Sequence, residues 1–294
     1  MTWAVIALGG NEGDVAETFR DAARQLRAAG CQLGRAADLF ETRPVGDAAG
    51  PGYGNSALTL QTTLSAPELL SLLQQVERLA GRQPGGHWRP RPLDLDLIAC
   101  GDVVCETAAL TLPHPAAWYR QFVLAPLAQV AGDWVHPWRK VSIAALRQRF
   151  QRRPLRVAVT GTSDTLAELW TQASPVDRTQ VDLRKIESPH ALAAEPVDLL
   201  AWLGPTASHG REHHSVGAQP GGGAGATPAG SSLGAVSRPS GEAGPKEFCD
   251  WPAELRLNAT AWRDRDAHWL RHLLQGLLDT PESRGPWWPE PPGA

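Results

Sequence analysis

The sequence predicts an α+β protein, in which an antiparallel sheet covered by two helices is followed by a smaller α/β region. Strand-like and helix-like segments alternate over the first 150 residues, and a strand–helix pattern returns after about residue 154. A stretch rich in Gly, Pro, Ser and Ala interrupts this second pattern. With 294 residues, a net charge of -3 and 42% hydrophobic residues, the chain is expected to be globular, with one large domain or two of ordinary size.

The first strand and the first helix follow from residues 3–30. Residues 3–8 are almost entirely apolar, as expected of a buried strand. A turn at 11–14 leads into a helix, with Asp14 as N-cap and Glu17 three residues later in a capping-box pattern. Apolar residues recur at helical spacing up to Ala29, and Gly30 ends the helix.

The remaining elements of the first region follow in the same way. They are a strand over 31–41, a Gly/Pro-rich loop over 43–54, a strand over 55–63, a helix capped by Ser65 and Glu68 and stopped by Gly81, a strand around Asp94 and Asp96, and a short hairpin partner near Val103 and Val104. This β-α-β-β-α-β order predicts a ferredoxin-like sandwich over 1–150, with two helices on one sheet face and the other face free for ligands.

The second region is predicted to be a Rossmann-like α/β layer over 154–203 and 248–280. Strands are expected over 155–160, 197–203 and 254–259, with helices over 164–172 and 262–278. Residues 204–247 carry almost no large apolar side chains and are predicted to be a disordered linker, while 281–294 form a Pro/Trp-rich tail. Gly161-Thr162-Ser163 follows a strand but lacks the spacing of a phosphate-binding loop.

Composition also limits the class of protein. The chain has no basic excess that would favour nucleic acid, and its N-terminus has neither the charge nor the length of a signal sequence or membrane span. Its four cysteines show no C-x-x-C spacing, so reduced thiols are expected. The prediction is a cytoplasmic protein with neither nucleic-acid nor membrane partners.

The segment that carries the most chemistry is the strand with Asp94 and Asp96. Leu93, Leu95 and Leu97 alternate with the two acids, so both carboxylates project from one face, about 6.6 Å apart. Their repulsion at an effective dielectric constant of ~20 is about 2.5 kcal/mol. A cation between them would relieve it, and oxygen-only ligands favour magnesium. A solvated strand face is the alternative for an isolated D-x-D pattern.

Motifs in the first 140 residues, in the same order, resemble those of hydroxymethyldihydropterin pyrophosphokinase, a folate-pathway family. They are Leu8-Gly9-Gly10-Asn11-Glu12-Gly13-Asp14, Glu41-Thr42-Arg43-Pro44, Tyr53-x-Asn55, Arg91-Pro92-Leu93-Asp94-Leu95-Asp96, and Pro113-His114-Pro115 with Arg120 and Phe122. The resemblance implies transfer of diphosphate from ATP to 6-hydroxymethyl-7,8-dihydropterin in tetrahydrofolate biosynthesis. The products are AMP and (7,8-dihydropterin-6-yl)methyl diphosphate, and two magnesium ions take part.

The resemblance assigns the phosphate and nucleotide side of the site. Asp94 and Asp96 are expected to bind both metal ions, and Arg82 and Arg91 to contact phosphate oxygens. Four further residues are expected to face the nucleotide: Gln74, Glu77, His114 and Arg120. Without the resemblance, the first two would fit a solvated helix face and the histidine a structural role.

The resemblance also assigns a slot for the pterin. Tyr53 and Phe122 are expected to sandwich the ring, and Asn55 to offer a donor and an acceptor to its edge. Backbone groups near Thr42 and Val45 complete that edge. Residues 81–88 are expected to form a mobile flap with glycine hinges, in which Trp88 acts as a lid.

Three features depart from the family pattern. Gly10 replaces a common serine, Arg89 replaces a common glycine, and the positive charge of the flap is reduced to Arg82 and His87. The rival hypothesis is a non-catalytic ferredoxin-like module that senses a metabolite or nucleotide. The paired acids argue against it, because a sensor of pterin alone needs no pair of magnesium ligands.

Overall fold

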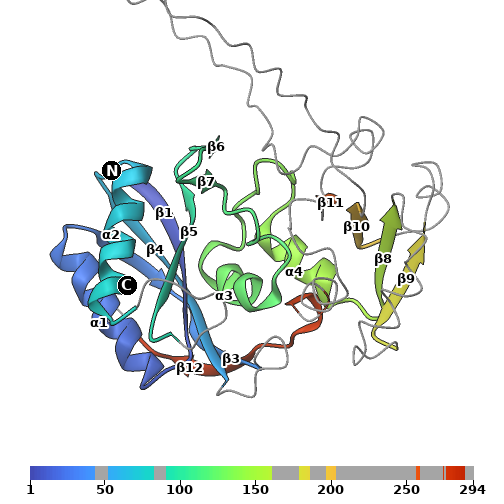
Figure 1. Ribbon diagram of the computed structural model, residues 1–294, viewed down its shortest axis with the longest axis horizontal. Helices are drawn as coiled ribbons and strands as arrows, with labels where there is room; N and C mark the ends of the chain where they lie inside the picture. The colour runs from blue at the N-terminus through green and yellow to red at the C-terminus, as the bar shows by residue number, and fades with distance from the viewer. Residues whose placement is uncertain are drawn as a thin grey trace, which may run out of the picture.

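The computed structural model describes residues 1–43, 52–82, 91–160, 179–185, 197–202, 256–258, 274 and 276–288. Its centre is a six-stranded antiparallel sheet in the order β12-β3-β4-β1-β5, with β2 also paired to β4 (Figure 1). The strands are β1 (Thr2–Gly10), β2 (Gln32–Ala36), β3 (Asp38–Thr42), β4 (Tyr53–Thr62), β5 (Asp94–Cys100) and β12 (Glu282–Pro286). The mixed α+β architecture predicted from the sequence is confirmed.

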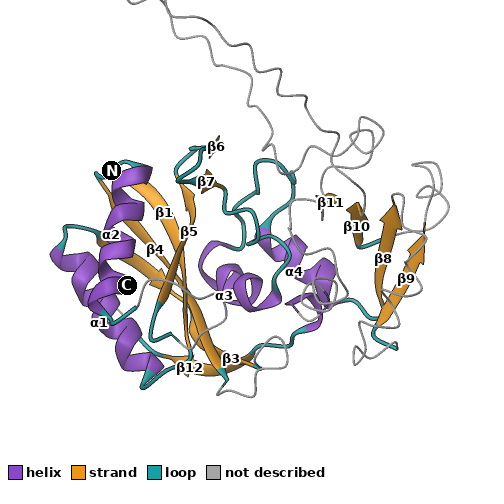
Figure 2. Cartoon of the chain, in the orientation of Figure 1, coloured by secondary structure: helices purple, strands orange, loops and turns teal. Residues whose placement is uncertain are grey.

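Two helices cover one face of this sheet, α1 (Val15–Ala28) and α2 (Ala66–Leu79), as Figure 2 shows. Asp14 caps α1 by accepting a hydrogen bond from the Glu17 backbone N–H at 3.0 Å. Glu17 does not return that bond, because its carboxylate binds Arg20 and Arg24 instead. At α2, the capping box forms as predicted, with Glu68 Oε2 2.8 Å from the Ser65 backbone nitrogen.

The opposite face is not free for ligands along its whole length, which corrects the sequence-based expectation. Helix α3 (Gln121–Ala131) packs on it through Val123, Leu124 and Leu127, and α4 (Ile143–Gln151) packs on α3. Neither helix was predicted. Strand β1 is therefore buried on both faces.

Two strand predictions also need correction. The strand expected over 31–41 is broken at Ala37, whose backbone N–H donates to the Ala57 carbonyl at 2.8 Å between β2 and β3. The turn at Gly101 and Asp102 forms as predicted, but Val103 and Val104 belong to no strand. The pairing falls a little later, between β6 (Cys105–Glu106) and β7 (Thr111–Leu112).

The second region forms its own parallel sheet, in the order β11-β10-β8-β9. Strands β8 (Leu155–Thr160), β10 (Leu199–Trp202) and β11 (Arg256–Asn258) lie within predicted strands, while β9 (Val181–Lys185) was not predicted. The linker predicted over 204–247 and the helix predicted over 164–172 lie outside the described residues. Among the described residues, no helix is long and apolar enough to cross a membrane.

The C-terminal segment returns to the first sheet, which corrects its interpretation as a tail. Leu274 and Leu277, from the predicted last helix, join the core around α3 and α4. Strand β12 then pairs antiparallel with β3 at the sheet edge (Figure 1). The chain leaves this domain after α4 and comes back beside its exit, since Arg153 Nη2 donates to the Leu278 carbonyl at 3.3 Å. The first domain is therefore discontinuous in sequence.

Glu77 connects α2 to β5 through a hydrogen bond. Its side chain is buried, and Oε1 accepts a hydrogen bond from the Leu95 backbone N–H at 2.8 Å. Arg82 also donates to this oxygen. Burial raises the pKa of Glu77, while the Leu95 amide and the Arg82 charge act in the opposite direction. Glu77 thus fixes the strand that carries Asp94 and Asp96.

We expect Trp287→Ala to lower the free energy of unfolding by about 3–5 kcal/mol, because it empties a core position. The Trp287 ring is 2% exposed, and its centre lies 5.5 Å from that of Phe19. Trp288→Ala is the control, since the neighbouring ring is only partly buried and should cost about 1 kcal/mol or less. Urea unfolding followed by circular dichroism measures both. Equal, small losses would mean that the C-terminal segment is not part of the core.

We expect Glu77→Ala to cost about 1–3 kcal/mol of stability, because it leaves the buried Leu95 N–H without its acceptor. Gln74→Ala on the same helix should stay within about 0.5 kcal/mol of the parent, since Gln74 is exposed. The same unfolding measurement distinguishes them. A Glu77 variant as stable as the Gln74 variant would contradict the joint described above.

Candidate active site

The candidate site lies where β4, β1 and β5 end beside one another. Gly9 of β1 pairs with Asn55 of β4 on one side and with Asp94 of β5 on the other. A Cβ at Gly9 would lie 3.8 Å from both Asn55 Oδ1 and Asp94 Cβ, so the glycine leaves the space between these two residues free of a side chain. Asn55 and Asp94 are two strand spacings apart, about 10 Å. The register thus places the predicted pterin side next to the predicted phosphate side.

Asp94 is held between two arginines. Arg82 Nη1 donates to Asp94 Oδ1 at 2.6 Å, and Arg91 Nη1 donates to Oδ2 at 3.0 Å. All three side chains are partly exposed, so these ion pairs lie near the protein surface. Three of the four residues expected to handle phosphate and metal are therefore in direct contact. The arrangement presents two guanidinium groups beside the carboxylate face of β5.

Asn11 is a positioning residue that sequence analysis missed. Asn11 is buried, and its side-chain Oδ1 accepts a hydrogen bond from the Arg91 backbone N–H at 2.9 Å. The Asn11 backbone N–H donates to the Arg91 carbonyl at 3.1 Å. The signal was available, because Asn11 belongs to the first quoted motif. Gly10 allows this close approach, since a Cβ there would lie 2.5 Å from the Pro92 carbonyl oxygen.

Asp96 lines an open pocket of about 270 Å³ next to β5. The pocket is also lined by Leu70, Leu97, residues 107–111 and His114. The His114 backbone N–H donates to the Ile98 carbonyl at 3.0 Å, which ties the histidine to the same strand. Burial lowers the pKa of His114, although the Asp96 charge favours the protonated ring. The pocket therefore offers apolar walls, a carboxylate and a mostly neutral imidazole.

Three of the residues predicted to bind the pterin lie at neighbouring ends of β3 and β4. Asn55 Nδ2 donates to Thr42 Oγ1 at 3.0 Å and to the Tyr53 carbonyl at 3.3 Å. Thr42 and Asn55 are buried, whereas Tyr53 is half-buried at the start of β4. These bonds fix the orientation of the Asn55 amide, which is the group expected to recognise the ring edge.

Arg120 and Phe122 stand at the beginning of α3. The Arg120 guanidinium lies 5.8 Å from the centre of the Phe122 ring, within the range of a cation–π contact. Phe122 is partly buried, with one side against the core around α3. Gln74 is exposed whereas Glu77 is buried, so the two residues do not share the common environment that their spacing predicts. Val45 and Trp88 lie outside the described residues.

The first half of the chain is similar to known proteins of one family. Residues 5–132 match the model of the 7,8-dihydro-6-hydroxymethylpterin-pyrophosphokinase (HPPK) family. The 2-amino-4-hydroxy-6-hydroxymethyldihydropteridine pyrophosphokinase of Synechocystis is 45% identical over 135 residues, which make up 46% of this chain and 69% of the relative. The mitochondrial folate synthesis bifunctional protein of Pisum sativum is 38% identical over 143 residues, 47% of this chain and 28% of the relative.

Among solved structures, wild-type Plasmodium falciparum HPPK-DHPS with pteroate is similar with a TM-score of 0.40 and 10% identity, over 68% of this chain and 56% of that one. The Synechocystis relative decides the assignment, because this chain covers more than two thirds of its length at 45% identity. The matched residues 5–132 contain most of β1, all of β4 and β5, and the residues that gather at their ends. The chain belongs to the 7,8-dihydro-6-hydroxymethylpterin-pyrophosphokinase (HPPK) family.

Proposed function

We propose that this chain transfers diphosphate from ATP to 6-hydroxymethyl-7,8-dihydropterin, giving AMP and (7,8-dihydropterin-6-yl)methyl diphosphate in tetrahydrofolate biosynthesis. The observation that carries the proposal is the row formed by Asn55, Gly9 and Asp94 across three strands. It sets a group suited to a pterin edge about 10 Å from an acidic face flanked by two arginines. That spacing suits two substrates that must meet between them.

The acidic face fits magnesium. Asp94 and Asp96 offer only oxygen ligands from one side of β5, and magnesium usually takes one or two carboxylates together with water and substrate phosphates. The described residues contain no cluster of three or more His, Cys, Asp or Glu side chains, so a larger protein cage is not offered there. Asp94 and Asp96 would hold the two expected ions. When bound, magnesium would neutralise phosphate charge and polarise the transferred group.

The residues around β5 can orient the triphosphate. Arg82 and Arg91 already neutralise Asp94, and both guanidinium groups match the geometry of phosphate oxygens. As phosphates arrive, these donors can pass from the carboxylate to the phosphate, and magnesium would then balance the charge of Asp94. His114 in the open pocket and Arg120 at α3 are proposed to face the nucleotide. Gln74 is proposed to reach it from the exposed side of α2.

On the pterin side, Asn55 is held by Thr42 and is proposed to read the ring edge together with backbone groups near Val45. Tyr53 and Phe122 are proposed to stack on the two faces of the ring. Trp88, in the flap over 81–88, is proposed to cover both substrates and exclude water. Because diphosphate transfer needs alignment more than covalent catalysis, these positioning roles account for most of the chemistry. The hydroxyl proton can pass to Asp96 or to water.

The finer fold assignment supports this function. Strands β3, β4, β1 and β5 with α1 and α2 on one face have the order of a ferredoxin-like sandwich, which we infer for the first domain. The parallel order β11-β10-β8-β9 favours a Rossmann-like layer for the second region. Cys31 and Cys100 are free buried thiols, in keeping with the cytoplasmic location proposed from the sequence. The sensing module is not favoured, because the acid–arginine cluster has no use in it.

We expect Asp96→Ala to lower the rate of AMP release from ATP and pterin about a thousandfold or more, because it removes an oxygen ligand and the charge that orients the metal. Asp102→Ala is the matched control, since this exposed acid follows the same strand without facing the site. AMP release is followed by chromatography with and without pterin and magnesium. Unchanged turnover in the Asp96 variant, or turnover that needs no pterin, would sink the assignment.

Tyr53→Ala should weaken pterin binding about tenfold or more while ATP binding stays within about twofold, because the stacking face is lost. Tyr53→Phe keeps the ring and should bind pterin almost as the parent does. Fluorescence titration of pterin and of an ATP analogue measures both affinities. Equal losses for the two ligands would contradict a pterin slot at Tyr53.

A further inference from the structure

Strand β12 completes the edge of the sheet that carries the pterin-side residues. It pairs with β3, with Glu282 opposite Glu41 and Ser283 opposite Phe40. Side chains reinforce the backbone pairing, since Ser283 Oγ donates to Asp38 Oδ2 at 2.8 Å and Arg284 Nε donates to Glu41 Oε2 at 2.7 Å. Without β12, β3 would be the edge strand.

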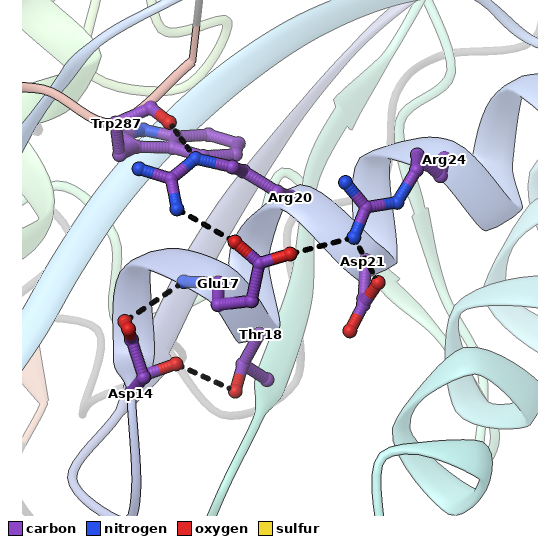
Figure 3. Close-up of polar contacts among 7 residues, drawn as sticks. All are labelled: Asp14, Glu17, Thr18, Arg20, Asp21, Arg24 and Trp287. Carbon is purple, nitrogen blue, oxygen red and sulfur yellow. Dashed lines mark hydrogen bonds and ion pairs between the residues drawn. The ribbon is translucent and has the colours of Figure 1, made fainter.

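The end of β12 is anchored on the other side of the sheet, against α1. Trp287 Nε1 donates to Ser56 Oγ at 2.6 Å, next to Asn55 in sequence. Its carbonyl accepts a hydrogen bond from Arg20 Nε at 2.8 Å, and Arg20 is held in turn by Glu17, as Figure 3 shows. The segment is therefore fixed by a buried ring, a buried hydrogen bond and the polar surface of α1.

The part that precedes β12 contacts the site from the α3 side. A Cβ at Gly276 would lie 3.9 Å from Arg120 Cγ and 4.0 Å from Phe122 Cε1, so the backbone at Gly276 packs close to both side chains. Burial raises the pKa of Asp279 to about 6, while the Thr280 backbone N–H and the Arg43 charge act in the opposite direction. The segment thus touches α3, the end of β3 and α1 in succession.

Apart from the backbone at Gly276, which also lies against Arg120, these contacts concern the pterin half of the site. Thr42 ends β3 and accepts the hydrogen bond that orients Asn55. The strand order β12-β3-β4-β1-β5 puts β12 at the edge opposite β5, four strand spacings away, or about 19 Å. A disturbance of β12 therefore reaches Thr42 and Asn55 before it reaches Asp94 and Asp96.

We propose that residues 276–287, here called the C-terminal clasp, position the pterin half of the site by holding β3 and backing Phe122. The inference rests on the proposed diphosphate transfer and adds positioning residues to it. The clasp residues act through Thr42, Asn55 and Phe122 and are not proposed to touch substrate. Their loss should therefore change the KM for pterin more than kcat or the KM for ATP.

Gly285 offers a test with a close control in the full-length chain. Gly285 has φ of 85° and Gly30 has φ of 87°, and a Cβ at either would meet no atom within 4 Å. Alanine should therefore strain both backbones to a similar degree. Gly285 lies within β12, whereas Gly30 follows α1 and contacts no residue assigned to the site. A second variant, Ser283→Ala with Arg284→Ala, removes the two side-chain bonds to β3 without backbone strain.

Both glycine variants should lose a similar few degrees of Tm, about 2–5 °C. Gly285→Ala should raise the KM for pterin about fivefold, with kcat and the KM for ATP within about twofold of the parent. The double variant should raise the KM for pterin about two- to threefold, and it decides the question if Gly285→Ala does not fold. Gly30→Ala should leave all three kinetic constants unchanged.

A pterin KM in the clasp variants equal to that of Gly30→Ala would overturn the proposal and leave the segment a merely structural brace. Equal rises in the KM for pterin and for ATP would overturn it as well, since they indicate general loosening. Failure of the proposed function looks different. The unmodified chain would then release no AMP in response to pterin, whatever its clasp variants did, and the clasp proposal would fall with it.

Discussion

The balance of charge around Asp94 is the interaction on which the rest of the site depends. Two carboxylates on one strand face repel each other, and in this structure Arg82 and Arg91 relieve the repulsion by holding both oxygens of Asp94. Glu77 positions this cluster, because its carboxylate accepts hydrogen bonds from the Leu95 backbone N–H and from the Arg82 side chain. The two guanidinium groups that are proposed to bind phosphate thus lie beside the acids that are proposed to bind magnesium.

The two halves of the site are joined by β1, which pairs with both β4 and β5. Gly9 lies between Asn55 and Asp94, and the lack of a side chain there leaves the space between them unfilled. Both faces of β1 are buried, so its register cannot slip by one residue without moving apolar side chains out of the core. The distance between the proposed pterin side and the proposed phosphate side is therefore set by the spacing of paired strands.

The second region enters the chain between α4 and the C-terminal clasp. The exit after α4 and the return at Leu278 lie side by side, so a whole parallel sheet can be accommodated there without distorting the first domain. The return has a second consequence, since β12 shields β3 from pairing with another chain. A region that appears unrelated to the site by sequence thus separates two parts of the domain that holds it.

Local sequence determined most of what the first domain does. Alternating Leu and Asp placed both acids on one face of β5, Asp14 and Ser65 marked the helix starts, and co-linear motifs identified the family. Tertiary structure alone decided three features: that Glu77 is buried while Gln74 is exposed, that α3 covers the second sheet face, and that Trp287 fills the core beside Phe19. The physical reason is range. Periodicity and capping depend on neighbours within a few residues, whereas the partner of β12 lies more than two hundred residues away and is selected only when the core closes.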